Sequence, residues 1–411
     1  MRIGPLRRVP RRAIVDPVIK YLGSKRKLIP RITACMALLP RVRRVTDLFS
    51  GTARVAMALK QAGYIVRAND HNSYAHLLAQ CYVEADGRDW RKKATQVIAE
   101  LNALPGRAGF VTEAYCLRSR YFQPHNGERI DAIRERIETL ALPPLLRAIA
   151  ITALIEAADR VDSTTGLQMA YLKRWAPRSY EPLQLRLPVL TERVGRRRCS
   201  ASQEDALALA AELEDDCVYL DPPYNQHSYL SNYHIWETLA RWDQPELYGV
   251  AMKRQDCRER RSPFNSKRQY RQAFETLIAA LRVRYLMVSF SDEGFISRQE
   301  MEAILARKGQ VHTLEHPYRR YVGAQIGICN HRGEVVGKVS HLNNNEYLYL
   351  VSPRRLDLSS LEVEATQLPA AARWVQPAAL QGRSGAVDVR GAEPAAVDQA
   401  EGDCAVAASQ A

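Results

Sequence analysis

Short apolar runs and amphipathic stretches alternate near the start of the chain. Residues 43–49 and 64–70 have the pattern of strands, and residues 25–39 and 53–62 have that of helices, the second of which stops at Gly63. Strand, loop, helix and strand in this order are typical of a parallel α/β sheet.

Helical periodicity replaces this alternation from residue 72 onward. It predicts helices at 72–86, 89–103, 128–141 and 144–158, and an irregular stretch rich in Arg, Pro and Tyr follows at 160–200. Because the region is too long for a loop, we expect an inserted, mainly helical subdomain.

The strand pattern returns after residue 200. Apolar runs predict strands at 217–221, 284–290, 310–315, 326–330, 334–339 and 346–351, with helices at 203–213, 233–241 and 267–282. The predicted organisation is a basic arm at 1–20, one α/β domain built from 21–74 and 200–352, an insert at 75–199 and a disordered tail with few aromatic residues at 362–411.

Composition adds charge to this picture. Apolar residues make up 46% of the chain and charged residues 25%, as in ordinary globular proteins, and neither a signal peptide nor a membrane-spanning run is visible. The eight cysteines show no C-x-x-C pair, so we expect reduced thiols in a cytoplasmic protein, without a zinc site. The net charge of +14 predicts attraction to a polyanion such as nucleic acid.

The strongest motif is Asp221-Pro222-Pro223-Tyr224, which directly follows an apolar strand. The two prolines end the strand, since proline cannot donate to a ladder. Asp221 and Tyr224 then lie at the carboxyl edge of the sheet, where open α/β folds bind ligands. An ordinary strand-ending turn is the alternative, because Asp and Pro are common in turns.

These four residues suit the methylation of an exocyclic adenine amine, whose lone pair is delocalised into the ring. The Asp221 carboxylate and the Pro222 carbonyl offer acceptors for the two N–H groups, and Asp221 is placed to take the proton after transfer. Tyr224 offers a flat face on which an extruded base can stack.

A second motif, Asp47-Leu48-Phe49-Ser50-Gly51, lies between the first strand and its helix. Gly51 lets the backbone turn tightly and approach a ligand. Asp70 ends the next strand about 20 residues later, the spacing of an acid that binds ribose hydroxyls. Such a glycine alone is usually structural, but the pairing with Asp70 favours a ligand site. The absence of G-x-G-x-x-G disfavours a nicotinamide dehydrogenase and suits AdoMet, which has no pyrophosphate.

Two further motifs fit the same cofactor. Tyr21, Gly23 and Lys25 open a helix, whose N-terminus suits the methionine carboxylate of AdoMet; a solvated basic helix start is the alternative. In Glu204-Asp205 an acid is placed to accept a hydrogen bond from the cofactor's adenine amine; the alternative is an acid that interacts with a helix N-terminus.

Aromatic and basic residues complete the candidates. For Trp236 core packing is favoured, whereas Tyr229, Tyr233 and His234 are candidates for the wall of a base pocket. Candidate DNA contacts are the basic loop at 316–325 and the insert residues Arg160, Tyr171, Lys173, Arg174, Trp175, Arg178, Tyr180 and Arg186; a solvated charged face is the alternative.

In their order along the chain, these motifs resemble those of Dam-type DNA adenine methyltransferases, in the alpha motif order, over about residues 18–352. The resemblance implies an α/β, Rossmann-like AdoMet-dependent methyltransferase sheet, mostly parallel and antiparallel at its end. It assigns catalysis to Asp221, Pro222, Pro223 and Tyr224, and cofactor binding to Tyr21, Gly23, Lys25, Asp47, Phe49, Gly51, Asp70 and Asp205.

The same resemblance implies AdoMet as methyl donor, no metal, and a target adenine flipped out of the duplex. The insert at 75–199 would serve target recognition, and residues 289–295 would border the active site. Ala53 stands where the family usually has a second glycine, so we expect its methyl group to narrow the cofactor site.

The expected protein is therefore a site-specific methyltransferase that acts on the N6 amine of adenine in double-stranded DNA. We expect a cytoplasmic, nucleoid-associated monomer, with a cognate restriction endonuclease as a candidate partner. Two alternatives stay open: an RNA adenine methyltransferase, and a nucleic-acid-binding protein that has this fold but no activity. Protein glutamine or cytosine N4 methylation is disfavoured, since Asn or Ser usually replaces Asp221 there.

Overall fold

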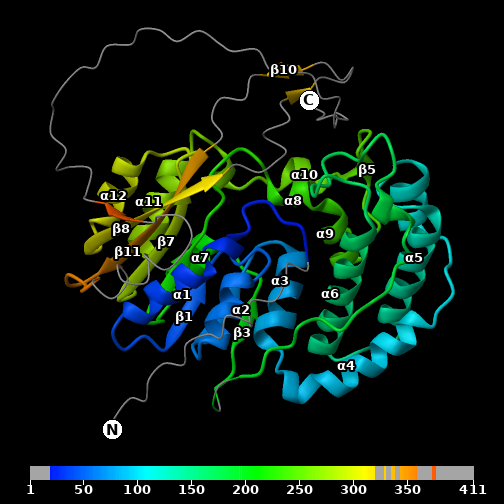
Figure 1. Ribbon diagram of the computed structural model, residues 1–411, viewed down its shortest axis with the longest axis horizontal. Coiled ribbons are helices and arrows are strands. Elements are labelled where there is room, and N and C mark those ends of the chain that lie inside the picture. Colours follow the sequence, from blue (N-terminus) through cyan, green and yellow to red (C-terminus); the bar gives the residue numbers. More distant parts are fainter. Residues whose placement is uncertain are drawn as a thin grey trace.

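The computed structural model describes residues 19–319 except 194 and 196, together with 328–329, 335–337, 343–358 and 373–375. Its centre is an eight-stranded sheet in the order β12-β8-β11-β7-β4-β1-β2-β3 (Figure 1). Strands β7, β4, β1, β2 and β3 are parallel, and β11, β8 and β12 extend the sheet through antiparallel pairs. The predicted fold class, mostly parallel and antiparallel at its end, is confirmed.

The long strands lie close to their predicted positions. The sheet consists of β1 Arg44–Asp47, β2 Ile65–Asn69, β3 Ser200–Ser202, β4 Cys217–Leu220, β7 Tyr285–Ser291, β8 Gln310–Arg319, β11 Asn343–Ser352 and β12 Arg373–Val375. Two separate pairs are β5 Leu247–Tyr248 with β6 Lys253–Arg254, and β9 Ile328–Cys329 with β10 Val335–Gly337. The sequence pattern misses β3, β5, β6 and β12, because two or three residues carry too little periodicity.

Alternate residues of the central strands face two hydrophobic cores. In β4, Cys217 and Tyr219 belong to one core, and Val218 and Leu220 belong to the other. All four are buried, as expected for a parallel strand with helices on both faces, and such a strand reads as a continuous apolar run. This is why β4 is visible in the sequence.

Helices cover both faces of the sheet. The larger core includes α1 Ile29–Leu38, α2 Arg54–Gln61, α3 Ser73–Ala79 and α9 His234–Arg241, and the smaller one includes α7 Ala206–Ala210, α11 Tyr270–Ala280 and α12 Arg298–Leu305. Shorter elements are α8 Tyr229–Asn232, α10 Asp256–Glu259 and the 3-10 turns η2 Lys25–Lys27, η5 Pro177–Tyr180 and η6 Pro263–Asn265. Among the helices of the described part of the chain, none has the length and apolarity needed to cross a membrane.

The insert packs beside the sheet as a group of helices (Figure 1). It contains α4 Gly87–Asn102, α5 Pro124–Thr139 and α6 Pro144–Val161, with the π-helical turns η3 Gln80–Glu84 and η4 Thr112–Leu117. Helix α6 is buried on nearly all sides, which is typical of a helix without a polar face. Its side chains belong to the same core as those of β1, β2 and β4, so the insert shares the core of the sheet.

Three expectations reach beyond the described residues. The basic arm at 1–20 is described only from Ile19, and the basic loop at 316–325 only to residue 319. Of the tail at 362–411, only Arg373–Val375 are described, and they form β12 against β8. At these three residues a strand replaces the expected disorder.

Ala53 has φ 56° and ψ 20°, in the left-handed region, at the start of α2. This conformation costs a residue with a Cβ atom about 1–2 kcal/mol. The methyl group is fully buried in the larger core, and Ala53 is not among the residues that line the cavity at the sheet edge. The expectation that this methyl group narrows the cofactor site is therefore wrong. Alanine at this position instead costs free energy through its left-handed backbone conformation.

We predict that Ala53→Gly lowers the free energy of unfolding less than Ala58→Gly does, by about 1–2 kcal/mol, because relief of the left-handed strain offsets the loss of a buried methyl group. Urea denaturation measures both changes. Ala58→Gly, inside the same helix, is the matched control, since it also removes a buried methyl group. An Ala53→Gly variant that is destabilised as much as Ala58→Gly would show that the backbone at residue 53 is not strained.

Candidate active site

Four predicted acidic residues lie at the ends of neighbouring strands. Asp47 ends β1, Asp70 directly follows β2, and Asp221 directly follows β4, while Asp205 lies just after β3. The four strands are parallel and adjacent in the order β4-β1-β2-β3, so their carboxyl ends share one edge of the sheet. Open α/β sheets bind their ligands at this edge.

A cavity of about 350 Å³ opens at this edge. All the predicted site residues line it except Pro222 and Tyr224; those that do are Tyr21, Gly23, Lys25, Asp47, Phe49, Gly51, Asp70, Asp205, Asp221 and Pro223. Ser50, Asn69 and the segment 259–265 complete much of the wall. Motifs spread over two hundred residues of sequence thus share one cavity.

Lys25, Asp221 and Glu346 form a buried charge cluster beside this cavity. The Lys25 Nζ atom lies 3.1 Å from Asp221 Oδ1 and 3.4 Å from Glu346 Oε2. The Lys25 side chain is only 5% exposed. Two carboxyl groups, one at the end of β4 and one on β11, therefore share a single ammonium group.

Burial sets the protonation of this cluster. It raises the pKa of Asp221 to about 6; Lys25 opposes the rise and Glu346 adds to it. Burial by itself lowers the pKa of Lys25, but the charges of Asp221 and Glu346 outweigh it, so that pKa lies well above its ordinary value. Lys25 stays charged while Asp221 titrates close to neutrality.

Gly51 and Asp70 hold each other in place. The Gly51 N–H donates to Asp70 Oδ2 at 2.9 Å, and the Asn72 N–H donates to Asp70 Oδ1 at 2.9 Å. Gly51 has φ +50°, and a Cβ atom there would lie 3.2 Å from the hydroxyl oxygen of Tyr21. Glycine is therefore required both by the turn and by the close approach of Tyr21.

Asp47 and Ser50 present unsatisfied polar atoms at the cavity. Both carboxylate oxygens of Asp47 and the Ser50 hydroxyl are buried without a hydrogen-bond partner among the described residues. Burial raises the pKa of Asp47 well above its ordinary value, and the neighbouring Asp221 and Asp70 raise it further. A cavity with so many carboxyl groups fits a cationic ligand such as the sulfonium and ammonium groups of AdoMet.

Tyr224 and Pro222 lie beside the cavity and do not line it. The Tyr224 ring packs edge-on against Phe290 of β7 with centroids 5.6 Å apart, and Lys25 Nζ lies 5.7 Å from the Tyr224 centroid. The Phe295 N–H donates to the Tyr224 carbonyl at 3.2 Å. Residues 289–295 therefore contact the turn at 221–224.

Asp205 lines the cavity but also caps a helix. Its Oδ1 atom accepts from the N–H groups of Leu207 and Ala208 at the start of α7, at 2.9 and 3.1 Å. This is the role that the sequence left open as the alternative. The neighbouring Glu204 pairs with Arg67 at 2.9 Å.

The aromatic residues that follow the turn at 221–224 divide between the cavity and the core. Tyr229 lines the cavity, whereas Tyr233, His234 and Trp236 are buried in the interior. Trp236 packs in the core, as predicted. Tyr21 stacks with both Tyr229 and Tyr233, with ring centroids 5.2 and 4.6 Å apart.

Sequence reasoning misses Glu346 and the wall formed by residues 259–265. Glu346 contacts Lys25 across 321 sequence positions, and no local motif marks such a pairing. The segment 259–265 carries a turn composition, Ser-Pro-Phe-Asn, but no spacing relates it to the cofactor motifs. His, Cys, Asp and Glu side chains nowhere form a metal-binding group within the described ranges.

The sequence matches the D12 class N6 adenine-specific DNA methyltransferases over residues 21–304. The chain belongs to this family. It is 30% identical to the Type II methyltransferase M.NlaIII of Neisseria lactamica over 79% of this chain and 98% of that protein. It is also 30% identical to the modification methylase StsI of Streptococcus sanguinis and to the Type II methyltransferase M.FokI of Planomicrobium okeanokoites, over 75% and 74% of this chain. The match covers 50% of each of these two proteins.

Membership of this family makes the protein a site-specific DNA methyltransferase that methylates adenine at N6, with AdoMet as the methyl donor. The resemblance drawn from the motif order is thereby confirmed.

We predict that the single-turnover rate of this methyltransferase falls as the pH falls through about 6, the pKa of Asp221. A protonated carboxyl group has lost its negative charge and cannot take up the amine proton, so protonation weakens the acceptor and removes the proposed base. Rates measured with saturating DNA and AdoMet on both sides of this pH check the prediction. A rate that stays level through this range would exclude Asp221 as the titrating acceptor.

Proposed function

We propose that Asp221 and the Pro222 carbonyl hold the target adenine amine beside AdoMet bound in the cavity at the sheet edge. The observation that carries this assignment is that Asp221 lines the same cavity as Gly51, Asp70 and Asp47. The methyl donor and the amine must meet within one enclosed space, and Asp221 is the acidic residue of the turn at 221–224 that lines it.

AdoMet, when bound, supplies an electrophilic methyl group on its sulfonium. Asp221 accepts one N–H of the adenine amine and the Pro222 carbonyl accepts the other, which directs the nitrogen lone pair away from the ring. As the new N–C bond forms, the bond from the methyl group to sulfur would break and S-adenosylhomocysteine would leave as a neutral thioether, and Asp221 accepts the proton that the nitrogen loses. Its pKa of about 6 suits this exchange near neutral pH.

Lys25 serves the catalytic carboxylate in this proposal. Its ammonium group forms ion pairs with Asp221 and Glu346. We therefore assign Lys25 the role of keeping Asp221 ionised, instead of the predicted role of binding the methionine carboxylate of AdoMet. Removing a buried ammonium would leave two carboxylates without compensation.

The remaining cavity residues hold the cofactor. Asp70 is placed for the ribose hydroxyls, because Gly51 and Asn72 fix its carboxylate at the end of β2. Asp47 offers unpaired acceptors to the positive groups of AdoMet. Asp205 and Glu204 lie at the end of β3, where an acceptor for the cofactor's adenine amine is needed.

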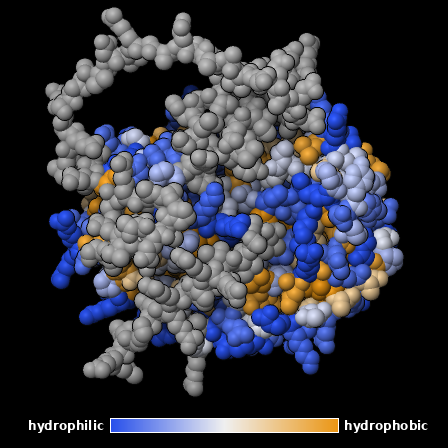
Figure 2. All heavy atoms as spheres, viewed as in Figure 1, coloured by the Kyte–Doolittle hydropathy of each residue, from blue (hydrophilic) through white to orange (hydrophobic). Residues whose placement is uncertain are grey.

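Double-stranded DNA is the proposed substrate, and the insert at 75–199 its recognition subdomain. Lys173 and Arg186 are exposed and available to phosphates, whereas Arg178 is bound to Asp162 and Arg160 donates to the Gln184 carbonyl. Hydrophilic residues predominate over the visible face of this helical part (Figure 2). We place the protein in the cytoplasm as a monomer, paired with a cognate endonuclease in the way of a modification enzyme.

The experiment is tritiated methyl transfer from AdoMet by wild-type protein and by Asp221→Ala. We expect the substitution to lower the rate by at least 10³-fold, because an acceptor made in the transition state is lost, while the affinities for DNA and AdoMet stay near wild type. Glu214→Ala is the matched control, since Glu214 is exposed near the amino end of the same strand. Substantial turnover by Asp221→Ala would mean that another group holds the amine.

Parallel reactions with double-stranded DNA, single-stranded DNA and RNA decide the substrate. Incorporation into duplex DNA, with affinity that weakens steeply as salt rises, supports the proposal. A preference for RNA would show that RNA, and not duplex DNA, is the substrate. No incorporation into any of these nucleic acids would show that the protein binds nucleic acid without methylating it.

A further inference from the structure

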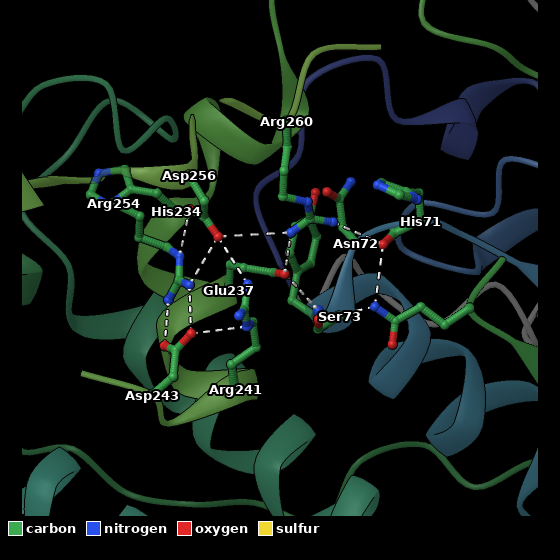
Figure 3. A network of polar contacts seen from close by, with 12 residues as sticks. His71, Asn72, Ser73, His234, Glu237, Arg241, Asp243, Arg254, Asp256 and Arg260 are labelled. Atoms are coloured by element: carbon green, nitrogen blue, oxygen red, sulfur yellow. Dashed lines mark hydrogen bonds and ion pairs between the residues drawn. The ribbon is translucent and has the colours of Figure 1, made fainter. Parts of the chain in front are cut away.

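Arg260 belongs to the wall of the cavity, although no catalytic or cofactor motif includes it. It directly follows α10, in the part of the chain that comes after the turn at 221–224. Its guanidinium Nη1 lies 3.1 Å from Glu237 Oε1, and its Nη2 donates to the His71 carbonyl at 3.2 Å. Figure 3 shows Arg260 between α9, which carries Glu237, and the turn that begins at His71.

Glu237 is fully buried, which makes its partners informative. Its Oε2 atom accepts from the Tyr74 N–H at 3.1 Å, and Oε1 accepts from Arg260. A buried carboxylate is costly unless it is paired and hydrogen-bonded. Glu237 therefore binds both the first turn of α3 and Arg260, and so holds the guanidinium at the cavity wall.

The His71 carbonyl is the acceptor that links this pair to the cofactor side. His71 directly follows Asp70, the acid assigned to the ribose, and Gln203 Nε2 also donates to the same carbonyl at 3.3 Å. Arg260 thus holds the turn after β2 at the His71 carbonyl, while Gly51 binds the Asp70 carboxylate. The direction of the Asp70 side chain depends on both.

A network behind Arg260 fixes the segment from which it projects. Arg254 is almost completely buried and pairs with Asp243 and Asp256, and Asp256 also pairs with Arg241 (Figure 3). Asp256 Oδ2 lies 3.9 Å from Arg260 Nη1. Buried charges in this arrangement leave the segment little freedom to move.

We propose that Arg260, held by Glu237, is a positioning residue for AdoMet that fixes the turn carrying Asp70. The proposal rests on the assignment of this cavity to AdoMet. The planar guanidinium is required, because it binds a carboxylate and a carbonyl at once, whereas a lysine ammonium in its place cannot keep both contacts in a fixed direction.

The test measures AdoMet and S-adenosylhomocysteine binding by calorimetry for wild type, Arg260→Lys and Arg258→Lys. Both variants keep the net charge, so DNA electrostatics are matched, and Arg258 lies on α10 against the ring of Tyr248. We expect Arg260→Lys to raise the Kd for both compounds about tenfold and to raise KM for AdoMet with little change in kcat. Arg258→Lys should bind as wild type does.

Glu237→Gln provides the second variant. If the pair acts as one unit, the effects of Arg260→Lys and Glu237→Gln on the Kd for AdoMet are not additive in the double variant. A loss of thermal stability and kcat with unchanged Kd would reduce Arg260 to a structural role and overturn the proposal. Additive effects would also overturn it, because Glu237 would then act independently.

Asp70→Ala separates this proposal from the assignment of the cavity. If Asp70→Ala weakens AdoMet binding and Arg260→Lys does not, only the role of Arg260 fails. If neither Asp70→Ala nor Arg260→Lys changes AdoMet binding, the assignment of the cavity fails as well.

Discussion

The buried ion pair between Lys25 and Asp221 is the interaction on which the site depends. A carboxylate enclosed at a sheet edge would otherwise take up a proton and lose its negative charge. Lys25 opposes that loss, and Glu346 shares the charge of Lys25 and so limits its effect. The balance leaves Asp221 with a pKa of about 6, between an ordinary carboxylate and a neutral acid.

The sheet topology brings these charges together. Adjacent parallel strands deliver Asp221, Asp47 and Asp70 to one edge, and the antiparallel β11 carries Glu346 to the same place. Helices on both faces exclude water from the strands. The carboxyl edge of the sheet therefore borders a core of low dielectric constant. The insert shares that core, so its helices and the strands of the sheet pack as one unit.

The sequence predicts those parts of the site that local rules determine. Strand-ending acids and the turn at Gly51 are visible because apolar runs and a glycine mark them, and the cavity contains them. Glu346 and Arg260 are not visible, since their partners lie far away in the sequence and no periodicity records a tertiary contact. Lys25 and Asp205, predicted to bind the cofactor, both line the cavity, and their contacts there are an ion pair with Asp221 and a helix cap.

The most direct test of this account is the pH midpoint of single-turnover methylation in Lys25→Met and Glu346→Gln. Loss of the ammonium should move the midpoint to higher pH, because Lys25 lowers the pKa of Asp221, and loss of the Glu346 charge should move it to lower pH. Opposite shifts would establish that the buried cluster controls the catalytic carboxylate. Shifts in the same direction, or none, would contradict it.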